Sequence, residues 1–363
     1  MEDMKRKIKA EIIEGSLNEH GQRITTWVLT YPRMIHAEMM THRVFSRNAA
    51  SSRAIPSKVM QKLVNDDPFV PVAFQYSHPG MQGTKYFELE DEIKVLRDDW
   101  IAASQAQLSI VDAMDNFECT KQLTNRLLEP FQWYTAIFTT TETENFFNLR
   151  CPQYEYATGD NFRSIKDAAQ YYSDEASRNR DMGLDEFAQE LREMSVLEKL
   201  KINNGQGEIH ISLLAEAMWD SMNEYDYKQL KAGEWHIPFG DKFEYKRLCE
   251  LPKVEGMTGS QQAKLHDEYK IKIATARCAR VSYNNFEGKD DYEADIKLYD
   301  ILKASGHFSP FEHVGRAMSD AEYEDNLRGR IHWDADTPDL MVPDNIKGWS
   351  GNFRGFVQLR QEI

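Results

Sequence analysis

Residues 24–56 read ITTWVLTYPRMIHAEMMTHRVFSRNAASSRAIP, and this stretch sets the fold expected for the chain. Ile24–Tyr31 is rich in β-branched and aromatic residues, which indicates a strand, and Pro32 follows where a helix can begin. Over Arg33–Phe45, apolar and histidine side chains recur at helical spacing. Ser46–Pro56 is basic and rich in hydroxyl groups, which is typical of a loop. The stretch therefore predicts a strand, a helix and then a basic loop.

Helical patterns predominate outside this stretch. Residues 84–117 keep apolar positions three and four apart, which predicts a long amphipathic helix. Glu208–Met222 and Tyr292–Ala304 also have helical spacing, whereas Ile271–Tyr283 has the composition of a strand. Leu127–Arg150 mixes helix and strand signals and is left unassigned. Alternating helices and strands of this kind predict an α+β fold in which helices dominate.

The segment 151–205 differs from its surroundings because it is polar and charged throughout. Helical patches occur at Ile165–Tyr172 and Leu184–Met194, so we expect a helical insertion. No internal repeat of fixed period is present. We expect residues 1–363 to form a single catalytic domain that carries this insertion.

Composition and charge narrow the classes of protein. The chain has 363 residues, 41% hydrophobic and 28% charged, which is ordinary for a globular protein. Its formal net charge of −15 repels polyanions, which favours a small anionic ligand in a local basic pocket over nucleic acid. No long apolar run and no signal peptide is seen, so we expect a cytoplasmic protein without membrane contact. The four cysteines form no C-x-x-C pair, so no metal is expected.

The residues from His42 to Arg53 are the strongest functional candidate in the sequence. Arginine, histidine and serine side chains gather there around a predicted helix end, and such donors can hold a phosphate monoester and a base edge. Composition alone favours a solvated basic loop over an anion site. The spacing of the residues is what distinguishes the two.

That spacing resembles the signature of the flavin-dependent thymidylate synthase (ThyX) family. The family signature is Arg-His-Arg, seven residues and Ser; here it reads Thr41-His42-Arg43, seven residues, Ser51 and then Arg53. In the family, two of three further similar segments precede the signature, whereas here they follow it, so the resemblance implies a circularly permuted order. New chain ends are tolerated where termini lie close together at the surface. The three segments are Phe146–Arg150, Ala279–Tyr283 and Ser309–His313.

The resemblance implies a ThyX-like fold, with helices around a mostly antiparallel sheet and residues 314–363 as a C-terminal extension. It implies transfer of a one-carbon unit from methylenetetrahydrofolate to C5 of a pyrimidine deoxynucleotide, most directly dUMP to dTMP, with FAD and NADPH as cofactors. It also implies a homotetramer with active sites shared between subunits. The residues matched to flavin or folate contacts are His42, Arg43, Asn148, Arg150, Ser282 and His313. Those matched to the nucleotide are Glu38, Asn48, Ser51, Ser52 and Arg53.

Several positions depart from the family where the base is read and activated. Glu38 stands where the family commonly has Gln, Ala49 where it has Glu, and Ala136 where it has a nucleotide-binding Arg. His210 takes the place of the Arg thought to promote ionisation of uracil N3, and a histidine is only partly cationic at neutral pH. Arg354, with Arg360 nearby, could supply the missing cation. We therefore name His210 and Arg354 as the candidate catalytic residues.

Three other interpretations remain open. The changed base contacts are compatible with a variant that leaves a hydroxymethyl group on dUMP or acts on dCMP. His36-Ala37-Glu38 has the His-x-Glu signature of a zinc-dependent nucleotide deaminase, but the Pro-Cys-x-x-Cys that must accompany it is absent. A protein that binds nucleic acid through the loop up to Arg53 is disfavoured by the net charge.

Overall fold

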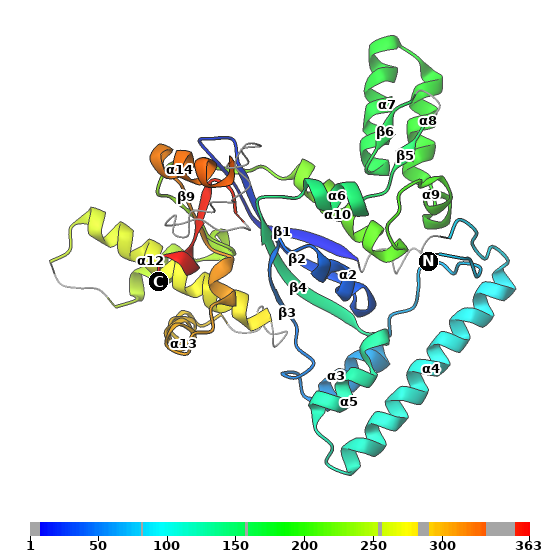
Figure 1. The fold of residues 1–363 in the computed structure, drawn as a ribbon, viewed down its shortest axis with the longest axis horizontal. Coiled ribbons are helices and arrows are strands. Elements are labelled where there is room, and N and C mark those ends of the chain that lie inside the picture. Colours follow the sequence, from blue (N-terminus) through cyan, green and yellow to red (C-terminus); the bar gives the residue numbers. More distant parts are fainter. Residues whose placement is uncertain (1–7, 81–82, 157–158, 253–255, 282–289, 332–352) are drawn as a thin grey trace, which may run out of the picture.

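A five-stranded sheet forms the centre of the computed structural model (Figure 1). In spatial order its strands are β3 (Ser46–Ala49), β4 (Trp133–Thr140), β2 (Arg23–Pro32), β1 (Lys9–Asn18) and β7 (Lys228–Leu230). Neighbouring strands are antiparallel except β1 and β7, which are parallel. The prediction of an α+β fold is confirmed. The structure describes residues 8–80, 83–156, 159–252, 256–281, 290–331 and 353–363.

Two small sheets lie beside the central one. β8 (Trp235–His236), β9 (Gly315–Ala317) and β10 (Phe356–Gln358) form a three-stranded antiparallel sheet, with β9 in the middle. This sheet joins the end of the chain to the segment that follows β7. β5 (Tyr154–Glu155) and β6 (Asn161–Phe162) form a two-stranded ribbon where the predicted insertion begins.

Helices surround the central sheet, and a hairpin of two helices projects from it (Figure 1). The projecting pair is α7 (Ile165–Asn179) and α8 (Met182–Glu193), followed by α9 (Val196–Ile202). Nearer the sheet lie α2 (His36–Thr41), α6 (Glu144–Arg150) and α10 (Ile209–Glu224), and a layer formed by α3 (Ser57–Asp66), α4 (Glu90–Asn116) and α5 (Lys121–Leu127). The remaining helices are α11 (Tyr245–Glu250), α12 (Gly259–Arg280), α13 (Tyr292–Ala304) and α14 (Asp320–Ile331). Short 3-10 turns occur at Arg33–Ile35, Glu129–Phe131, Gly240–Lys242, Ser309–Glu312 and Leu359–Gln361.

Each face of the sheet has its own hydrophobic core. Successive residues of a strand point to opposite faces, so Phe138 belongs to one core and Ile137 to the other. The first core joins Trp27 and other residues of β2 to α2, α3, α6 and α10. The second joins the sheet to α12, α13 and the turn at Ser309–Glu312. We call these the α10 face and the α12 face.

The clearest sequence patterns correspond to observed elements. The predicted strand Ile24–Tyr31 is β2, and the long helix expected over 84–117 is α4. The helices predicted at Glu208–Met222 and Tyr292–Ala304 are α10 and α13. Within 151–205, α7 and α8 contain the two predicted helical patches and share a small core of their own. The status of this segment as an insertion and the single-domain assignment stay predictions.

The strand predicted at Ile271–Tyr283 is wrong for its described part, which lies in α12 and the turn after it. A capping box between Thr258 and Gln261 begins this helix. Its C-terminal half is buried on nearly every side, because Ile271 and every residue from Ile273 to Ala279 are buried. A helix buried all round loses the apolar and polar alternation by which it could be told from a buried strand.

The loop predicted over Ser46–Pro56 is also wrong in its first part. Residues 46–49 form β3, an edge strand paired antiparallel with β4. Ser46 and Asn48 point into the protein, while Arg47 and Ala49 are half-buried. Burial therefore alternates along β3 as in any strand, but the buried side chains are polar. A short polar edge strand has little hydrophobic signal to reveal it. In the described part of the chain, no helix is both long and apolar enough to cross a membrane.

Candidate active site

The basic segment of the sequence becomes a tight turn between α2 and β3. His42 ends α2, and Phe45 precedes the strand. The Arg47 guanidinium donates to the carbonyl oxygens of His42 and Phe45 at 3.2 and 3.4 Å. One arginine therefore fixes the turn that carries Arg43 to the surface, where its side chain is exposed.

His42 meets Arg150 at this turn, although 108 residues separate them. Arg150 Nε donates to His42 Nε2 at 3.1 Å, and the His42 ring lies edge-on to Phe146 with 4.9 Å between ring centroids. An arginine has no acceptor, so His42 Nε2 is unprotonated and the neutral ring carries its proton on Nδ1. Burial, together with the charge of Arg150, lowers the pKa of His42 to about 4. The imidazole is therefore neutral at physiological pH.

A second set of rings and cations lies at the start of α2. The Tyr31 hydroxyl is 2.9 Å from His36 Nδ1, and the Tyr134 ring lies against both side chains. The Arg33 guanidinium lies over the Tyr134 ring, 4.4 Å from its centroid. Burial and the charges of Arg33 and Arg47 lower the pKa of His36 to about 4. These side chains form one partly buried wall. The wall combines the positive charge of Arg33 with neutral imidazole and phenol groups.

The serines of the signature lie close to this wall. Ser51 Oγ accepts from the backbone N–H of Arg53 at 3.3 Å, which closes a local turn. Ser52 Oγ donates to Glu129 at 3.4 Å, and Glu129 pairs with Arg33 at 3.5 Å. A cavity of about 150 Å³ opens beside Ser52, and its wall includes Gln132, Trp133, Tyr134 and several apolar side chains. Its size suits a small ring rather than a whole dinucleotide.

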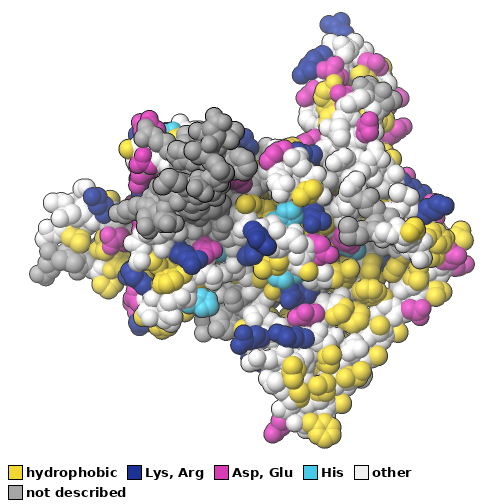
Figure 2. All heavy atoms as spheres, viewed as in Figure 1, with side chains coloured by type: hydrophobic (Ala, Val, Ile, Leu, Met, Phe, Trp, Pro, Cys, Tyr) yellow, Lys and Arg dark blue, Asp and Glu magenta, His cyan; other side chains and the backbone are white. Residues whose placement is uncertain are grey.

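Unpaired polar groups mark this face as fit for an anionic ligand. Among the described residues, the exposed guanidiniums of Arg43 and Arg53 have no hydrogen-bond or ion-pair partner. Glu38 Oε2 is buried and likewise has no partner there. Figure 2 shows cationic and histidine side chains gathered over α2 and the segment that follows it. Unpaired guanidiniums bind phosphate with charge-assisted hydrogen bonds.

The two predicted asparagines lie apart from each other. Asn48 is 8% exposed, and its Nδ2 donates to the Cys278 carbonyl of α12 at 3.5 Å, so it points to the α12 face. Asn148 is exposed on α6 and accepts a hydrogen bond from Arg163 of the predicted insertion. Asn148 is thus on the same short helix as Arg150, whereas Asn48 faces the opposite core.

His313 also lies on the α12 face, away from His42. It is fully buried, with Nδ1 2.8 Å from the Thr139 hydroxyl of β4. Its Nε2 is buried without a partner among the described residues. The structure therefore does not bring His313 to the turn that holds His42 and Arg150. Ser282, the other residue predicted on this side, lies outside the described residues.

His210 is held by the fold through both ring nitrogens. The Val72 backbone N–H donates to Nε2 at 3.2 Å, and Nδ1 lies 2.6 Å from Glu208 Oε1. The residue is 2% exposed and packs edge-on against Phe69. Because neither nitrogen is available to a ligand, this geometry favours a structural role for His210.

Arg354, by contrast, lies close to the turn. Its backbone N–H donates to Thr141 Oγ1 at 2.7 Å, and its guanidinium pairs with Glu142 while remaining 54% exposed. The hydroxyl of Thr140, one residue earlier, donates to the Val44 carbonyl at 3.2 Å. Val44 directly follows Arg43. The C-terminal segment therefore brings a cation to the edge of the sheet that carries Arg43.

Two positions singled out from the sequence are cross-strand neighbours. Ala49 of β3 is paired directly with Ala136 of β4. Side chains at directly paired positions of antiparallel strands lie about 4.5–5.5 Å apart. Neither alanine carries a charge, so this pair of positions offers no polar side chain to a ligand.

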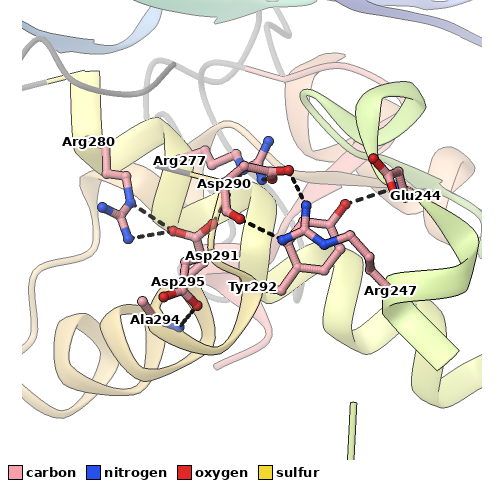
Figure 3. A network of polar contacts seen from close by, with 9 residues as sticks. All are labelled: Glu244, Arg247, Arg277, Arg280, Asp290, Asp291, Tyr292, Ala294 and Asp295. Carbon is pink, nitrogen blue, oxygen red and sulfur yellow. Dashed lines mark hydrogen bonds and ion pairs between the residues drawn. The ribbon is translucent and has the colours of Figure 1, made fainter. Parts of the chain in front are cut away.

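The C-terminal end of α12, which carries Ala279 and Arg280, is anchored by an ionic network (Figure 3). Arg280 pairs with Asp295 of α13 at 2.7 Å, and Arg277 Nε lies 3.4 Å from the same carboxylate. Asp290 pairs with both Arg277 and Arg247. Asp295 is completely buried, and burial raises its pKa against the opposing effect of the two arginines.

The sequence does not indicate that Arg33 and Tyr134 belong to the site, because they meet only through the pairing of β2 with β4. The sequence places His36 in a His-x-Glu pattern, and in the structure it is the first residue of α2. Within the described part of the chain, no group of three or more His, Cys, Asp or Glu side chains could hold a metal ion. The thiol of Cys151 is buried, which raises its pKa.

Acid should destabilise the protein through the buried histidines of this site. His36 and His42 have an ordinary pKa of 6.5, and burial lowers both to about 4. Between these pH values both histidines are protonated in the unfolded chain but not in the native state. The free energy of unfolding therefore falls as pH falls from 6.5 to about 4. Glu14 and Asp220, whose pKa values burial raises to about 7 and about 6, oppose this loss. Urea unfolding of His42→Gln across this range should show a shallower pH dependence than the unaltered protein, and parallel curves would contradict the assignment.

Comparison with known proteins finds only distant likeness. No family model matches the chain, and no curated protein matches it. A structure of the UMP/dUMP methylase PolB from Streptomyces cacaoi, bound with 5-Br UMP, is 13% identical, covers 60% of this chain and 89% of PolB, and has a TM-score of 0.39. A structure of PolB bound with 5-Br dUMP is 14% identical, covers 43% of this chain and 66% of PolB, and has a TM-score of 0.31. No residue role is carried over at these values.

Proposed function

We propose that this chain is a flavin-dependent enzyme with a permuted ThyX-like fold. It would transfer a one-carbon unit from methylenetetrahydrofolate to C5 of a pyrimidine deoxynucleotide, with dUMP to dTMP as the first candidate reaction. FAD and NADPH are the proposed cofactors. When bound, the flavin supplies the hydride that completes a methyl group.

The observation that carries this proposal is the contact between His42 and Arg150. The two residues belong to separate segments that each resemble the family, and 108 residues lie between them. Nothing in either segment alone requires the other to be near. Their hydrogen bond supports the view that the segments form one site and are not chance likenesses.

The residues of this face have the chemistry that the proposed ligands need. Arg43 and Arg53 are unpaired among the described residues and would bind phosphate groups, assisted by the Ser51 and Ser52 hydroxyls. His42 is held neutral by burial and by Arg150, so it would offer its Nδ1–H as a donor. The small cavity beside Ser52 would exclude water from a bound ring.

Activation of the base is assigned to Arg354. Attack by pyrimidine C5 requires a ring made electron-rich by polarising donors, and a guanidinium provides them without changing its protonation state. Arg354 is half-exposed beside Thr141, whereas His210 is buried with both nitrogens engaged. Of the two candidates named from the sequence, Arg354 has the geometry to reach a ligand.

One observation favours dCMP as an alternative substrate, with a hydroxymethyl product on dCMP or dUMP as a further variant. Glu38 Oε2 is buried and lacks a donor among the described residues. A carboxylate accepts hydrogen bonds and reads the exocyclic amino group of cytosine. The missing charges at Ala49 and Ala136 agree with a changed mode of base recognition.

A homotetramer with active sites shared between subunits is also part of the proposal, and it rests on the resemblance of the sequence alone. Localisation in the cytoplasm stays a prediction.

One assay tests the proposed function. The purified protein should be yellow or should become so with FAD, and it should modify dUMP when given methylenetetrahydrofolate and NADPH. Mass spectrometry of the nucleotide distinguishes a methyl from a hydroxymethyl product, and a parallel reaction with dCMP identifies the base. A protein that binds no FAD and changes neither nucleotide would refute the proposal.

A further inference from the structure

A chain of buried, hydrogen-bonded side chains crosses the α12 face of the sheet. Its hydroxyl groups come from three adjacent strands, β1, β2 and β4, and its imidazoles from β8 and the segment before β9. None of its six members is more than 2% exposed. In bonded order they are Glu14, Ser16, His236, Thr26, Thr139 and His313.

Each link of this chain is within hydrogen-bond distance. Ser16 Oγ donates to Glu14 Oε1 at 3.4 Å and lies 2.9 Å from His236 Nδ1. The other nitrogen of His236 is 2.8 Å from Thr26 Oγ1. Thr26 Oγ1 is 2.7 Å from Thr139 Oγ1, which is 2.8 Å from His313 Nδ1.

An ionised Glu14 fixes the direction of every one of these bonds. A carboxylate only accepts, so Ser16 donates to Glu14 and must accept from His236 Nδ1–H. A neutral His236 then accepts at Nε2 from the Thr26 hydroxyl. Thr26 in turn accepts from Thr139, which accepts from His313 Nδ1–H. The result is a His313 ring whose Nε2 is a bare lone pair, and this atom is buried without a partner among the described residues.

The two ends of the chain lie in different surroundings. Glu14 lines a surface cavity of about 610 Å³, together with Lys228 of β7 and Asp241 of the 3-10 turn at Gly240–Lys242. Charged side chains of α12 also line this cavity, so water and buffer ions have access to the Glu14 end. The α12 residues are Lys264, Asp267, Glu268 and Lys270. His313, at the other end, is closed off from solvent.

We propose that this chain is a proton relay between His313 Nε2 and the cavity at Glu14. A proton that binds His313 Nε2 is matched by transfer of the Nδ1 proton to Thr139, whose own hydroxyl proton passes to Thr26. Thr26 protonates His236 Nε2, His236 Nδ1 releases its proton to Ser16, and Ser16 protonates Glu14. One proton enters at His313 Nε2 and one proton arrives at Glu14. Every group between them ends with as many protons as it had before the transfer.

The charges around the relay suit a transfer through neutral rings. Burial, and the nearby Asp241, raise the pKa of Glu14 to about 7 against the opposing charge of Lys228, so the carboxyl can exchange protons near neutrality. The charge of Glu14 also acts on the Tyr225 phenol, whose pKa is raised by burial and by this charge. Burial lowers the pKa of both His236 and His313 to about 3, so neither becomes an imidazolium during the transfer.

A role in turnover rests on the proposed function, in which replacement of the hydrogen at pyrimidine C5 releases a proton and His313 belongs to the flavin and folate side of the site. The relay itself can be tested without flavin or nucleotide. Failure of the proposed function would therefore leave the relay standing, and absence of the relay would leave the one-carbon transfer untouched.

The test is magic-angle-spinning NMR of the full chain labelled with ¹⁵N-histidine, recorded on both sides of neutrality. Protonated and unprotonated ring nitrogens have distinct shifts, and the chain contains only ten histidines. We expect His236 and His313 to exchange tautomers together as Glu14 titrates, with both rings neutral throughout. In Glu14→Gln, which cannot titrate, both rings should keep one tautomer at every pH.

Thr26→Val locates the path, because it removes the central hydroxyl at nearly constant volume. His236 should still follow Glu14 through Ser16, whereas His313 should no longer respond. The matched control is Thr25→Val, since Thr25 is equally buried on β2 but bonds to Tyr227 outside the relay. Rings that keep one tautomer while Glu14 titrates in the unaltered protein, or that still switch in Glu14→Gln, would overturn the proposal.

Discussion

Arg150→Ala should weaken FAD binding by about ten- to a hundredfold. Arg150 donates to His42 and is the link between the turn after α2 and α6. In the proposed function Arg150 also donates to the flavin, and a hydrogen bond from a charged group to the ligand contributes roughly 1.5–3 kcal/mol, which corresponds to this range. The variant also removes the partner that holds the His42 ring in place. Titration of the apoprotein with FAD, followed by flavin fluorescence, measures the change.

Two further variants make the result specific. Arg150→Lys keeps the positive charge but cannot reproduce the Nε donor in the plane of a guanidinium, so we expect an intermediate affinity. Arg178→Ala removes an exposed arginine of α7 that pairs with Glu175, and it should bind FAD as the unaltered protein does. If Arg150→Ala and Arg178→Ala bind FAD equally well, Arg150 has no part in a flavin site.

The sequence predicts elements well where one face is buried and the other is solvated. Helices α4, α7 and α8 have that character, and each was expected near its observed position. Prediction from the sequence pattern fails at α12, because the C-terminal half of this helix has almost no solvated side. It also overlooks β1, because a register shift between Ile12 and Glu14 interrupts the alternation on which strand recognition depends.

The site could be predicted only as far as its residues are close in sequence. The spacing from His42 to Arg53 identifies the basic turn, and Arg150 was matched through a separate segment. Tertiary structure then separates residues that the resemblance groups together, since His210 and His313 are buried away from the turn. A local pattern carries no information on which face of a sheet a distant residue will reach.

Ala49 and Ala136 illustrate the same limit. Read along the chain, the two positions are unrelated. In the sheet they are direct cross-strand partners. Only the pairing of β3 with β4 brings them together, and no local sequence pattern predicts that pairing.

Asp295→Ala should lower the free energy of unfolding by about 3–5 kcal/mol, the usual cost of removing one member of a buried ion pair. Asp295 is completely buried and is shared by Arg277 and Arg280, whose side chains are only 10% and 12% exposed (Figure 3). Without the carboxylate, Arg280 keeps no ion-pair partner among the described residues, and Arg277 keeps only Asp290. The buried guanidiniums must then be solvated by water, which requires α12 to move away from α13.

Urea unfolding followed by circular dichroism measures this loss, and Asp300→Ala supplies the matched control. Asp300 lies on the same helix as Asp295, but it is exposed and pairs with Lys272 at 3.3 Å. An exposed pair of this kind contributes about 0–1 kcal/mol, so its midpoint should hardly move. Equal midpoints for the two variants would mean that Arg277 and Arg280 are solvated in the native state, and that the network does not hold α12 to α13. A large difference would show that the end of α12, which carries Arg280, is fixed by this single buried carboxylate.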